Sequence, residues 1–365
     1  MRRGKVKELR KYNFSAGPSV MPEEVLRKAA SEMLDYKGSG MSVMEMSHRG
    51  PVFKKIFDET KVKLKALYNV PDTYEILFLQ GGATSQFAAI PMNLIEGGKA
   101  DYAVTGRFSA LAAEEAGKYG NVNISYSGKE EGFRRIPSRN ELKLSDDAKY
   151  FYYCDNNTIY GTQWSYIPDV NSELVCDISS SALSKQIDIS KFGLLYAGAQ
   201  KNMAPAGLTT VIVKKSLSGR ELPITPKIMS YKVQIEKDSM LNTPPCWCIY
   251  MLGLTIDWIA EKGGIEMMQK NARERSALLY DFLDESSFYI KRAELKSRSP
   301  MNVTFKTPSE ELDAAFCKEA EQKGLLSLKG HKSTGGIRAS LYNAMPIEGV
   351  RALVDFMKEF EIKNV

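Results

Sequence analysis

Histidine and paired cysteine are scarce in this sequence. Its 365 residues include two histidines, His48 and His331, and five cysteines, none of which forms a CxxC pair. A zinc site built from cysteine and histidine is therefore hard to assemble. The cysteines, at positions 154, 176, 246, 248 and 317, are best interpreted as buried apolar side chains in a reducing compartment.

Long apolar runs and a concentrated basic face are missing too. No stretch approaches the roughly 20 apolar residues that a membrane helix needs, and the basic start MRRGKVKELRKYNF lacks the apolar core of a signal peptide. The net charge of +6 comes from scattered residues, which gives little support for nucleic-acid binding. We therefore expect a cytoplasmic protein with neither a membrane nor a nucleic-acid partner.

The apolar residues that are present alternate between strand and helix patterns. Helical patterns open at Thr84 or Ser85, and again at 107, where the second one runs to Gly120. Such alternation builds a parallel sheet covered by helices. Apolar runs of strand length lie at 74–80, 100–106, 149–156, 172–179, 192–200 and 208–215.

The pattern changes after Pro244-Pro245. Two helical stretches separated by Gly263-Gly264 are followed by strand, helix, strand and helix patterns. We predict an α/β protein whose large domain, 18–264, has a mostly parallel mixed sheet flanked by helices. A smaller C-terminal α/β domain covers 265–365, and residues 1–17 pack with it.

Lys201 stands where the apolar run 192–200 ends, among small residues in FGLLYAGAQKNMAPAG. On position alone it reads as an ordinary surface lysine. Small neighbours also suit an amine that loses its proton and bonds to a carbonyl carbon. Asp177 ends the preceding apolar run, and alone it is as well explained as a helix N-cap. Together, a lysine and an aspartate at the ends of successive strands are what pyridoxal phosphate requires, because the carboxylate keeps the pyridine nitrogen protonated.

Gly81-Gly82 follows another strand and precedes a helix, so the free N–H groups of the helix could bind a phosphate. A tight turn explains the same glycines equally well. No GxxxxGK[ST] or GxGxxG motif is present, and Tyr196 and Lys201 are five residues apart rather than four. P-loop and dinucleotide-dependent oxidoreductase functions are therefore weakly supported.

Five stretches together resemble the phosphoserine aminotransferase family of the class V aminotransferases, and the resemblance runs from Asn13 almost to the last residue. The most specific are AGAQKN and GGIRASLYNAMP. The stretches are MSVMEMSHRG (41–50), FLQGGATSQFAAIPMNL (78–94), DISSSALSKQIDISKFGLLYAGAQKNMAPAGLT (177–209), LNTPP (241–245) and LKGHKSTGGIRASLYNAMPIEGV (328–350).

The resemblance implies the type I fold of pyridoxal-phosphate-dependent aminotransferases and a homodimer with shared active sites. It implies that Lys201 bonds to the cofactor and moves the proton, and that Asp177 pairs with the pyridinium nitrogen. The other implied cofactor contacts are Thr158 near the phenolic oxygen, Phe108 on the ring, the backbone of Ala83 and Thr84 with the Gln200 side chain on the phosphate, and Asn242 and Thr243 on that phosphate from the neighbouring subunit.

The family's reaction moves the amino group of L-glutamate to 3-phosphooxypyruvate, giving O-phospho-L-serine and 2-oxoglutarate in serine biosynthesis. In some relatives 4-phosphohydroxy-L-threonine of vitamin B6 synthesis is a further product. Both substrates are anionic, so the pocket should gather cations. The matching positions are Arg338 for the α-carboxylate, and His48, Arg49, His331 and Lys332 for the distal carboxylate or phosphate.

Three positions depart from the family pattern. Thr84 stands where some members carry arginine, Phe108 where tryptophan is common, and Lys332 where many have arginine. Lysine keeps the charge but loses the planar fork, and phenylalanine keeps the π face but loses the indole donor. Two other functions stay open: a cysteine desulfurase of the same fold, which needs a reactive cysteine, and a nucleotide-binding protein that uses the Gly81-Gly82 loop without covalent chemistry.

Overall fold

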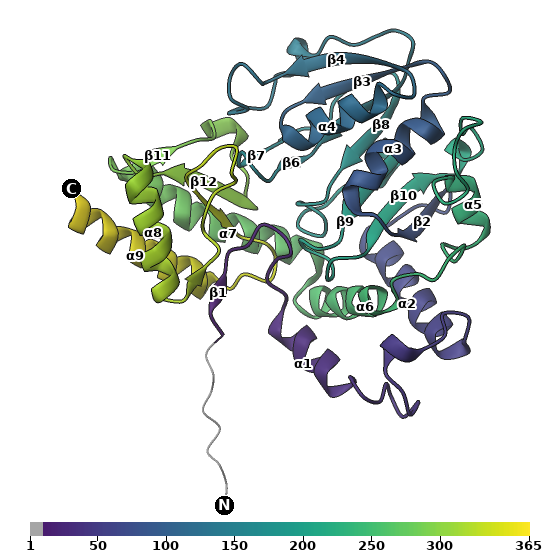
Figure 1. Ribbon diagram of the computed structural model, residues 1–365, viewed down its shortest axis with the longest axis horizontal. Helices are drawn as coiled ribbons and strands as arrows, with labels where there is room; N and C mark the ends of the chain where they lie inside the picture. Colours follow the sequence, from purple (N-terminus) through teal and green to yellow (C-terminus); the bar gives the residue numbers. More distant parts are fainter. Residues whose placement is uncertain (1–9) are drawn as a thin grey trace, which may run out of the picture.

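A seven-stranded sheet forms the centre of the larger part of the molecule (Figure 1). The computed structural model describes residues 10–365. Strands lie in the order β2-β10-β9-β8-β5-β3-β4, and every neighbouring pair is parallel except those that β10 makes with β2 and β9. The bounds are β2 Tyr74–Leu79, β3 Lys99–Val104, β4 Asn121–Ser127, β5 Ala148–Cys154, β8 Glu173–Asp177, β9 Leu194–Gly198 and β10 Thr209–Lys214.

Helices cover both faces of this sheet. On β5, Phe151 and Tyr153 join the apolar cluster of α2 and α6, whereas Tyr150 and Tyr152 join that of α3 and α4. This alternation follows from the two-residue period of a strand. The helices of this part are α1 Glu23–Ser31, α2 Pro51–Leu67, α3 Gly82–Leu94, α4 Arg107–Ala116, α5 Tyr231–Glu236 and α6 Cys246–Glu261.

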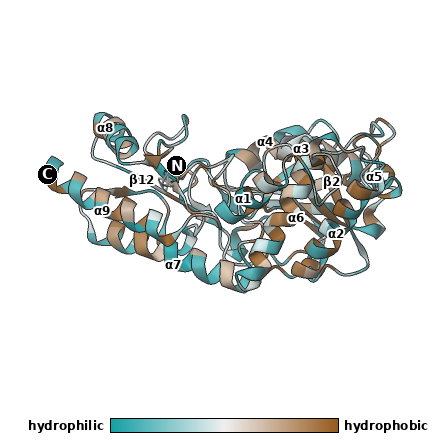
Figure 2. Ribbon diagram, turned by 90° about the horizontal axis from the view of Figure 1, so that it is seen from below, coloured by the Kyte–Doolittle hydropathy of each residue, from teal (hydrophilic) through white to brown (hydrophobic). Residues whose placement is uncertain are grey.

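A smaller unit follows α7 (Gly264–Glu285) and contains the antiparallel sheet β11-β12-β14. In Figure 2, α9 alternates between hydrophobic and hydrophilic colour, as expected of a helix with one buried face. Its elements are β11 Ile290–Lys291, β12 Asn302–Lys306, α8 Glu310–Gln322, β13 Leu325–Leu326, β14 Ile337–Ser340 and α9 Ile347–Asn364.

The N-terminal end of the described chain joins this smaller unit. β1 (Tyr12–Asn13) pairs in parallel with β13, and Phe14 is fully buried in the cluster of α7, α8 and α9. Residues 1–9 of the predicted N-terminal segment lie outside the described residues. α7 contributes Ile265 to the large cluster and Leu279 to the small one, so the boundary expected between 264 and 265 stays a prediction.

The expected α/β class and mixed, mostly parallel sheet are confirmed, with local differences. α3 begins at Gly82 rather than at Thr84 or Ser85, and α4 ends at Ala116 rather than at Gly120. No α-helix separates β8, β9 and β10, where helices were expected: the 3-10 turn η3 (Ile189–Lys191) lies before β9, and only turns join β9 to β10. None of the described helices is long and apolar enough to cross a membrane.

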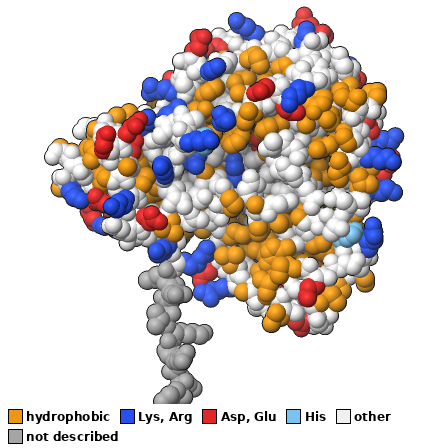
Figure 3. Space-filling view, viewed as in Figure 1, with side chains coloured by type: hydrophobic (Ala, Val, Ile, Leu, Met, Phe, Trp, Pro, Cys, Tyr) orange, Lys and Arg blue, Asp and Glu red, His pale blue; other side chains and the backbone are white. Residues whose placement is uncertain are grey.

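Large apolar side chains are exposed in several places, among them the stretches 26–52 and 224–228. Figure 3 shows them gathered over α1 and α6 and again toward α5. Leu34 is 86% exposed and Ile224 68%. A patch of this kind marks a contact surface more often than a solvated one. Further exposed members are Leu26, Met41, Met44, Val52 and Ile228.

Candidate active site

The carboxyl ends of five strands meet at one edge of the large sheet. Gly198 of β9 is in register with Thr209 of β10, which is in register with Leu79 of β2. Asp177, the last residue of β8, is in register with Cys154, the last residue of β5. β3 lies beyond β5 in the same direction, so the segments that follow β2, β3, β5, β8 and β9 all emerge together.

Lys201 lies three residues beyond β9, with its amine at this edge. Its Nζ donates a hydrogen bond to Thr158 Oγ1 at 2.7 Å and lies 5.5 Å from the centroid of the Phe108 ring. The lysine is half-buried and forms no ion pair within residues 10–365. It is therefore not a freely solvated surface lysine, and its amine lies beside two side chains that were expected to contact the same cofactor.

A loop from the N-terminal segment holds the backbone of Lys201. The Ser19 N–H donates to the Gln200 carbonyl at 3.0 Å, and the Ser19 hydroxyl donates to the Lys201 carbonyl. Gly17 has φ +143°, and a Cβ on it would lie 3.4 Å from Lys201 Cγ. These contacts position Lys201 from a segment almost 200 residues away in sequence.

Asp177 is a buried carboxylate without a cationic partner. It is 4% exposed, and its Oδ1 accepts a hydrogen bond from the Ser179 N–H at 2.8 Å, so it also caps a turn. Its other oxygen makes no hydrogen bond in the part of the chain that the structure describes. Burial, reinforced by the negative charge of Asp177, raises the pKa of the Cys154 thiol, while the positive charge of Lys201 acts in the opposite direction. A buried charge of this kind is costly unless a cation joins it, and a protonated pyridine nitrogen fits that need.

The N terminus of α3 provides the expected anion cradle. Gly81 has φ +91°, and a Cβ there would lie 1.8 Å from Ser85 Oγ, so only glycine fits. The N–H groups of Ala83 and Thr84 donate to no acceptor among the described residues. The Gln200 side chain packs against Gly198, whose added Cβ would be 2.9 Å from Gln200 Oε1. Free N–H groups at a helix start suit a phosphate.

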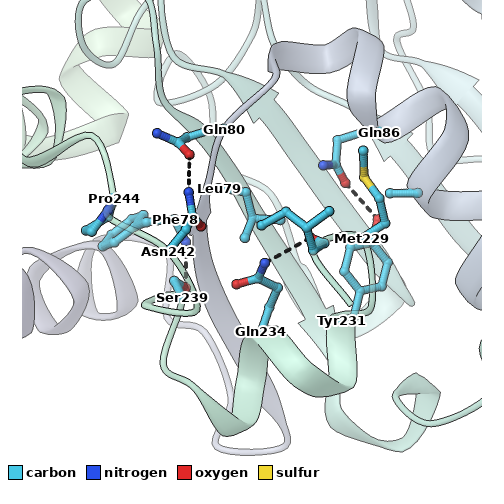
Figure 4. A pocket seen from close by; sticks show the side chains of 12 residues that line it. Phe78, Leu79, Gln80, Gln86, Met229, Tyr231, Gln234, Ser239, Asn242 and Pro244 are labelled. Atoms are coloured by element: carbon cyan, nitrogen blue, oxygen red, sulfur yellow. Dashed lines mark hydrogen bonds between the residues drawn. The ribbon is translucent and has the colours of Figure 1, made fainter. Parts of the chain in front are cut away.

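Asn242 lies beside the residue that precedes Gly81 (Figure 4), and Thr243 follows it in the chain. Asn242 Nδ2 donates to Gln80 Oε1 at 2.6 Å, and Gln80 Nε2 donates to the Thr243 carbonyl at 3.4 Å. Both residues are exposed and contact the residue just before Gly81 of their own chain. Their expected contact with a phosphate in the neighbouring subunit stays a prediction.

The cations expected to bind substrate fall into two groups. Arg338 on β14 is half-buried, and burial lowers the pKa of its guanidinium. The pKa of His331 is lowered by burial of its ring and, in addition, by the positive charge of Arg338. Lys332 is exposed, and its positive charge also lowers the pKa of His331. His48 and Arg49 precede α2 instead, and no hydrogen bond or ion pair between described residues joins them to Lys201. The Nε2 atom of His48 is buried without a partner.

The sequence prediction missed several residues that the fold brings to this edge. Gly17 and Ser19 lie in NFSAGPS (13–19), where the family resemblance begins, but no role was predicted for either. Arg107 precedes Phe108, and Arg292 lies with its Cζ 5.2 Å from the centroid of the Tyr160 ring. Arg107 could have been predicted from the sequence because it stands next to Phe108, which was expected to lie on the cofactor ring. Nothing in the sequence around Arg292 indicates a role for it.

Comparison with known proteins supports the fold and shows the family. The model of the class-V aminotransferases matches residues 11–353. The chain belongs to this family. The class-V chain is 50% identical over 351 residues to a phosphoserine aminotransferase of Laribacter hongkongensis, an alignment that covers 96% of this chain and 98% of that protein.

Solved structures agree with the assignment of this class-V aminotransferase. Its fold matches a phosphoserine aminotransferase from Bacillus circulans subsp. alkalophilus with a TM-score of 0.95 and 43% identity, covering 98% of this chain and 99% of that one. A pyridoxal-phosphate-bound phosphoserine aminotransferase from Trichomonas vaginalis gives a TM-score of 0.92 and 41% identity, covering 96% and 100%. The expected type I aminotransferase fold is thereby confirmed.

Proposed function

We propose that this class-V aminotransferase is a phosphoserine aminotransferase. It transfers the amino group of L-glutamate to 3-phosphooxypyruvate, with pyridoxal 5'-phosphate as cofactor, and yields O-phospho-L-serine and 2-oxoglutarate. The observation that carries the proposal is the meeting of the Lys201 amine, the Thr158 hydroxyl and the Phe108 ring at the edge where Asp177 ends its strand. The names of the relatives support the choice of substrates.

The residues at this edge fit the cofactor. Asp177 would hold the pyridine nitrogen protonated, Phe108 would lie on the ring, and Thr158 would contact the phenolic oxygen. The backbone of Ala83 and Thr84, with the Gln200 side chain, would bind the phosphate. Once bound, the cofactor supplies an electron sink for the electron pair left at the substrate Cα when a proton departs.

The side chains of the chain itself then carry the proton and orient the substrate. The Lys201 amine takes the proton from Cα of glutamate and later returns one to Cα of the new amino acid. Thr158, 2.7 Å from that amine, holds it in place between these steps. Arg338 binds the α-carboxylate through its planar fork, which fixes the Cα–H bond toward Lys201.

The same pocket serves two substrates in turn. Glutamate leaves its amino group and departs as 2-oxoglutarate, and the phosphorylated keto acid then accepts that group. His331 and Lys332 provide hydrogen-bond donors and charge for the distal end of each substrate. This ping-pong order needs only one binding site, because each keto acid leaves before the next substrate enters.

We also propose that two copies of the chain form a dimer with shared sites. The exposed apolar side chains at residues 26–52 and 224–228 offer a contact surface. Among the described residues no hydrogen bond or ion pair joins His48 or Arg49 to Lys201, and Asn242 and Thr243 are exposed, which supports a place for these residues in a partner's site. The five free cysteines fit a reducing, cytoplasmic compartment.

The structure gives the desulfurase alternative no suitable nucleophile. Burial raises the pKa of all five cysteines, well above the ordinary value for Cys154 and Cys176 and to about 11 for Cys317. A reactive cysteine needs a lowered pKa and exposure. Transamination therefore explains the site better than sulfur transfer.

The test is a visible spectrum of the purified protein, followed by borohydride reduction and peptide mapping. We expect a yellow protein with the reduced cofactor fixed to Lys201, a band that glutamate bleaches and that 3-phosphooxypyruvate restores. Lys201→Ala should lose the covalent label, whereas Lys191→Ala, which removes an exposed lysine before β9, should keep it. A label on another lysine, or a protein that stays colourless with added cofactor, would refute the proposal.

A further inference from the structure

Four cationic side chains and His331 lie near one another beside the site, and no carboxylate among the described residues pairs with any of them. Within residues 10–365, no ion pair involves Arg107, Arg292, His331, Lys332 or Arg338. Most other long-chain cations near the sheet edges do have partners, such as Lys185 with Asp155 at 2.7 Å. Uncompensated charge of one sign in a hollow attracts a multiply charged ligand of the opposite sign.

The backbone fixes Arg107 at this mouth. It is the first residue of α4, and the preceding Gly106 packs so closely on the loop after β5 that a Cβ there would lie 2.6 Å from Asn157 Oδ1 and 3.2 Å from Tyr160 Cδ2. The next residue, Phe108, lies 5.5 Å from the Lys201 amine. The Arg107 side chain is exposed and makes no hydrogen bond among the described residues.

Tyr160 connects Arg107 to the second missed arginine. Its ring lies 5.2 Å from Arg292 Cζ, and the charges of both Arg292 and Arg107 oppose the burial that raises the pKa of its phenol. Arg292 donates from Nη2 to the Gly132 carbonyl at 3.1 Å, while its Nε is buried without a partner. Arg292 and Arg338 line one small cavity together with Gly330 and Thr334. Arg292 and Arg338 therefore share one cavity, and Arg107 lies near enough for its charge to act on both Tyr160 and His331.

His331 cannot supply the positive charge of this space at neutral pH. Burial lowers its pKa below the ordinary value of 6.5, and Arg338, Arg107 and Lys332 lower it further. The Ser333 N–H and hydroxyl both lie within hydrogen-bond distance of Nδ1, at 3.2 Å and 2.7 Å, so Nδ1 accepts and Nε2 carries the proton. Neutral His331 is thus a hydrogen-bond donor, and the charge must come from arginine and lysine.

We propose that Arg107 binds the phosphate group of the keto-acid substrate and thereby favours phosphorylated over unphosphorylated acceptors. The inference rests on the proposed function and assigns a specificity role to a residue outside the set expected from the family resemblance. With Arg338 assigned to the α-carboxylate, His331 and Lys332 are the groups of this chain already assigned to the dianionic end, and neither offers a planar fork of donors. Arg107 supplies it at the N terminus of α4, where the helix dipole adds to the attraction.

The experiment compares Arg107→Ala and Arg107→Lys with the wild-type holoenzyme. Arg107→Ala should raise KM for 3-phosphooxypyruvate about 10- to 100-fold, with kcat changed less than about threefold, because a lost charge-assisted hydrogen bond weakens binding without touching Lys201. The KM for glutamate and for unphosphorylated hydroxypyruvate should change much less. Arg107→Lys should recover part of the affinity, since it keeps charge but not the fork.

A second readout and a matched control separate the possible failures. Inorganic phosphate should compete with the keto acid in the wild type, and its inhibition constant should rise in Arg107→Ala. Arg351→Ala removes an exposed arginine of α9 that has no ion pair among the described residues, and it should leave all constants unchanged. Equal KM shifts for phosphorylated and unphosphorylated acceptors, or an unchanged phosphate inhibition constant, would overturn the inference. A wild type inactive toward 3-phosphooxypyruvate would instead refute the proposed function.

Discussion

Replacing Gly81 by alanine should damage the phosphate cradle by a calculable amount. Gly81 has φ +91°, and the added Cβ would lie 1.8 Å from Ser85 Oγ and 2.7 Å from Ser85 Cβ. The left-handed conformation costs an alanine about 1–2 kcal/mol. Relieving the overlap with Ser85 costs about 1–3 kcal/mol more. We therefore expect Gly81→Ala to lower the free energy of unfolding by about 2–5 kcal/mol.

The neighbouring Gly82 provides the control. It also has a positive φ, of +67°, but a Cβ there meets no atom within 4 Å. Gly82→Ala should therefore cost only about 1–2 kcal/mol, the conformational part. A third variant, Ser85→Gly, removes both atoms that the new methyl group would strike. In the Ser85→Gly variant, Gly81→Ala should lower the free energy of unfolding by about as much as Gly82→Ala does in the wild type.

Urea denaturation followed by circular dichroism gives the four free energies of this double-mutant cycle. Cofactor affinity gives a second readout, because movement of Ser85 displaces the N–H groups of Ala83 and Thr84. The dissociation constant for pyridoxal phosphate should rise more in Gly81→Ala than in Gly82→Ala. The steric argument is refuted if the two alanine variants are equally stable, or if Ser85→Gly does not reduce the cost of Gly81→Ala.

Three further measurements test the site. Asp177→Asn should lower kcat by about 100-fold or more while leaving the far-UV spectrum unchanged, because the amide cannot hold the pyridine nitrogen protonated; near-normal turnover would argue against that role. Mixing inactive Lys201→Ala with inactive Arg49→Ala subunits should restore about a quarter of wild-type activity if sites are shared across a dimer, and no recovery would argue against sharing. The pKa of His331 is lower in the folded protein than its ordinary value of 6.5, so the unfolded chain binds a proton more readily. The free energy of unfolding should therefore fall as the pH drops through 6.5. His331→Asn should flatten this slope, and an unchanged slope would contradict the assignment.

The sequence sufficed for the core of the site because strand ends are easy to recognise. Asp177 and Lys201 each follow an uninterrupted apolar run, and parallel neighbours carry their last residues to the same edge. The antiparallel direction of β10 was not visible in its apolar run, because such a run has the same composition in either direction.

Contacts that depend on distant segments were beyond the sequence. Arg292 reaches the ring of Tyr160 across more than 100 positions, and Ser19 reaches the Lys201 carbonyl across 182. Hydrophobic periodicity carries information only about neighbours along the chain. His48 and Arg49 illustrate the same limit, since their motif predicted a binding role while the single chain leaves them away from Lys201.

The number of residues between β1 and the segment that contacts Lys201 is fixed by the structure. Asn13 is paired with Leu326 in the two-stranded sheet β1-β13, and Ser19 contacts the Lys201 loop only six positions later. No slack loop lies between these two anchors, so removal of one residue from 14–18 must break either the strand pairing or the contact with Lys201. Insertions and deletions that surface loops elsewhere absorb would therefore be selected against in this segment.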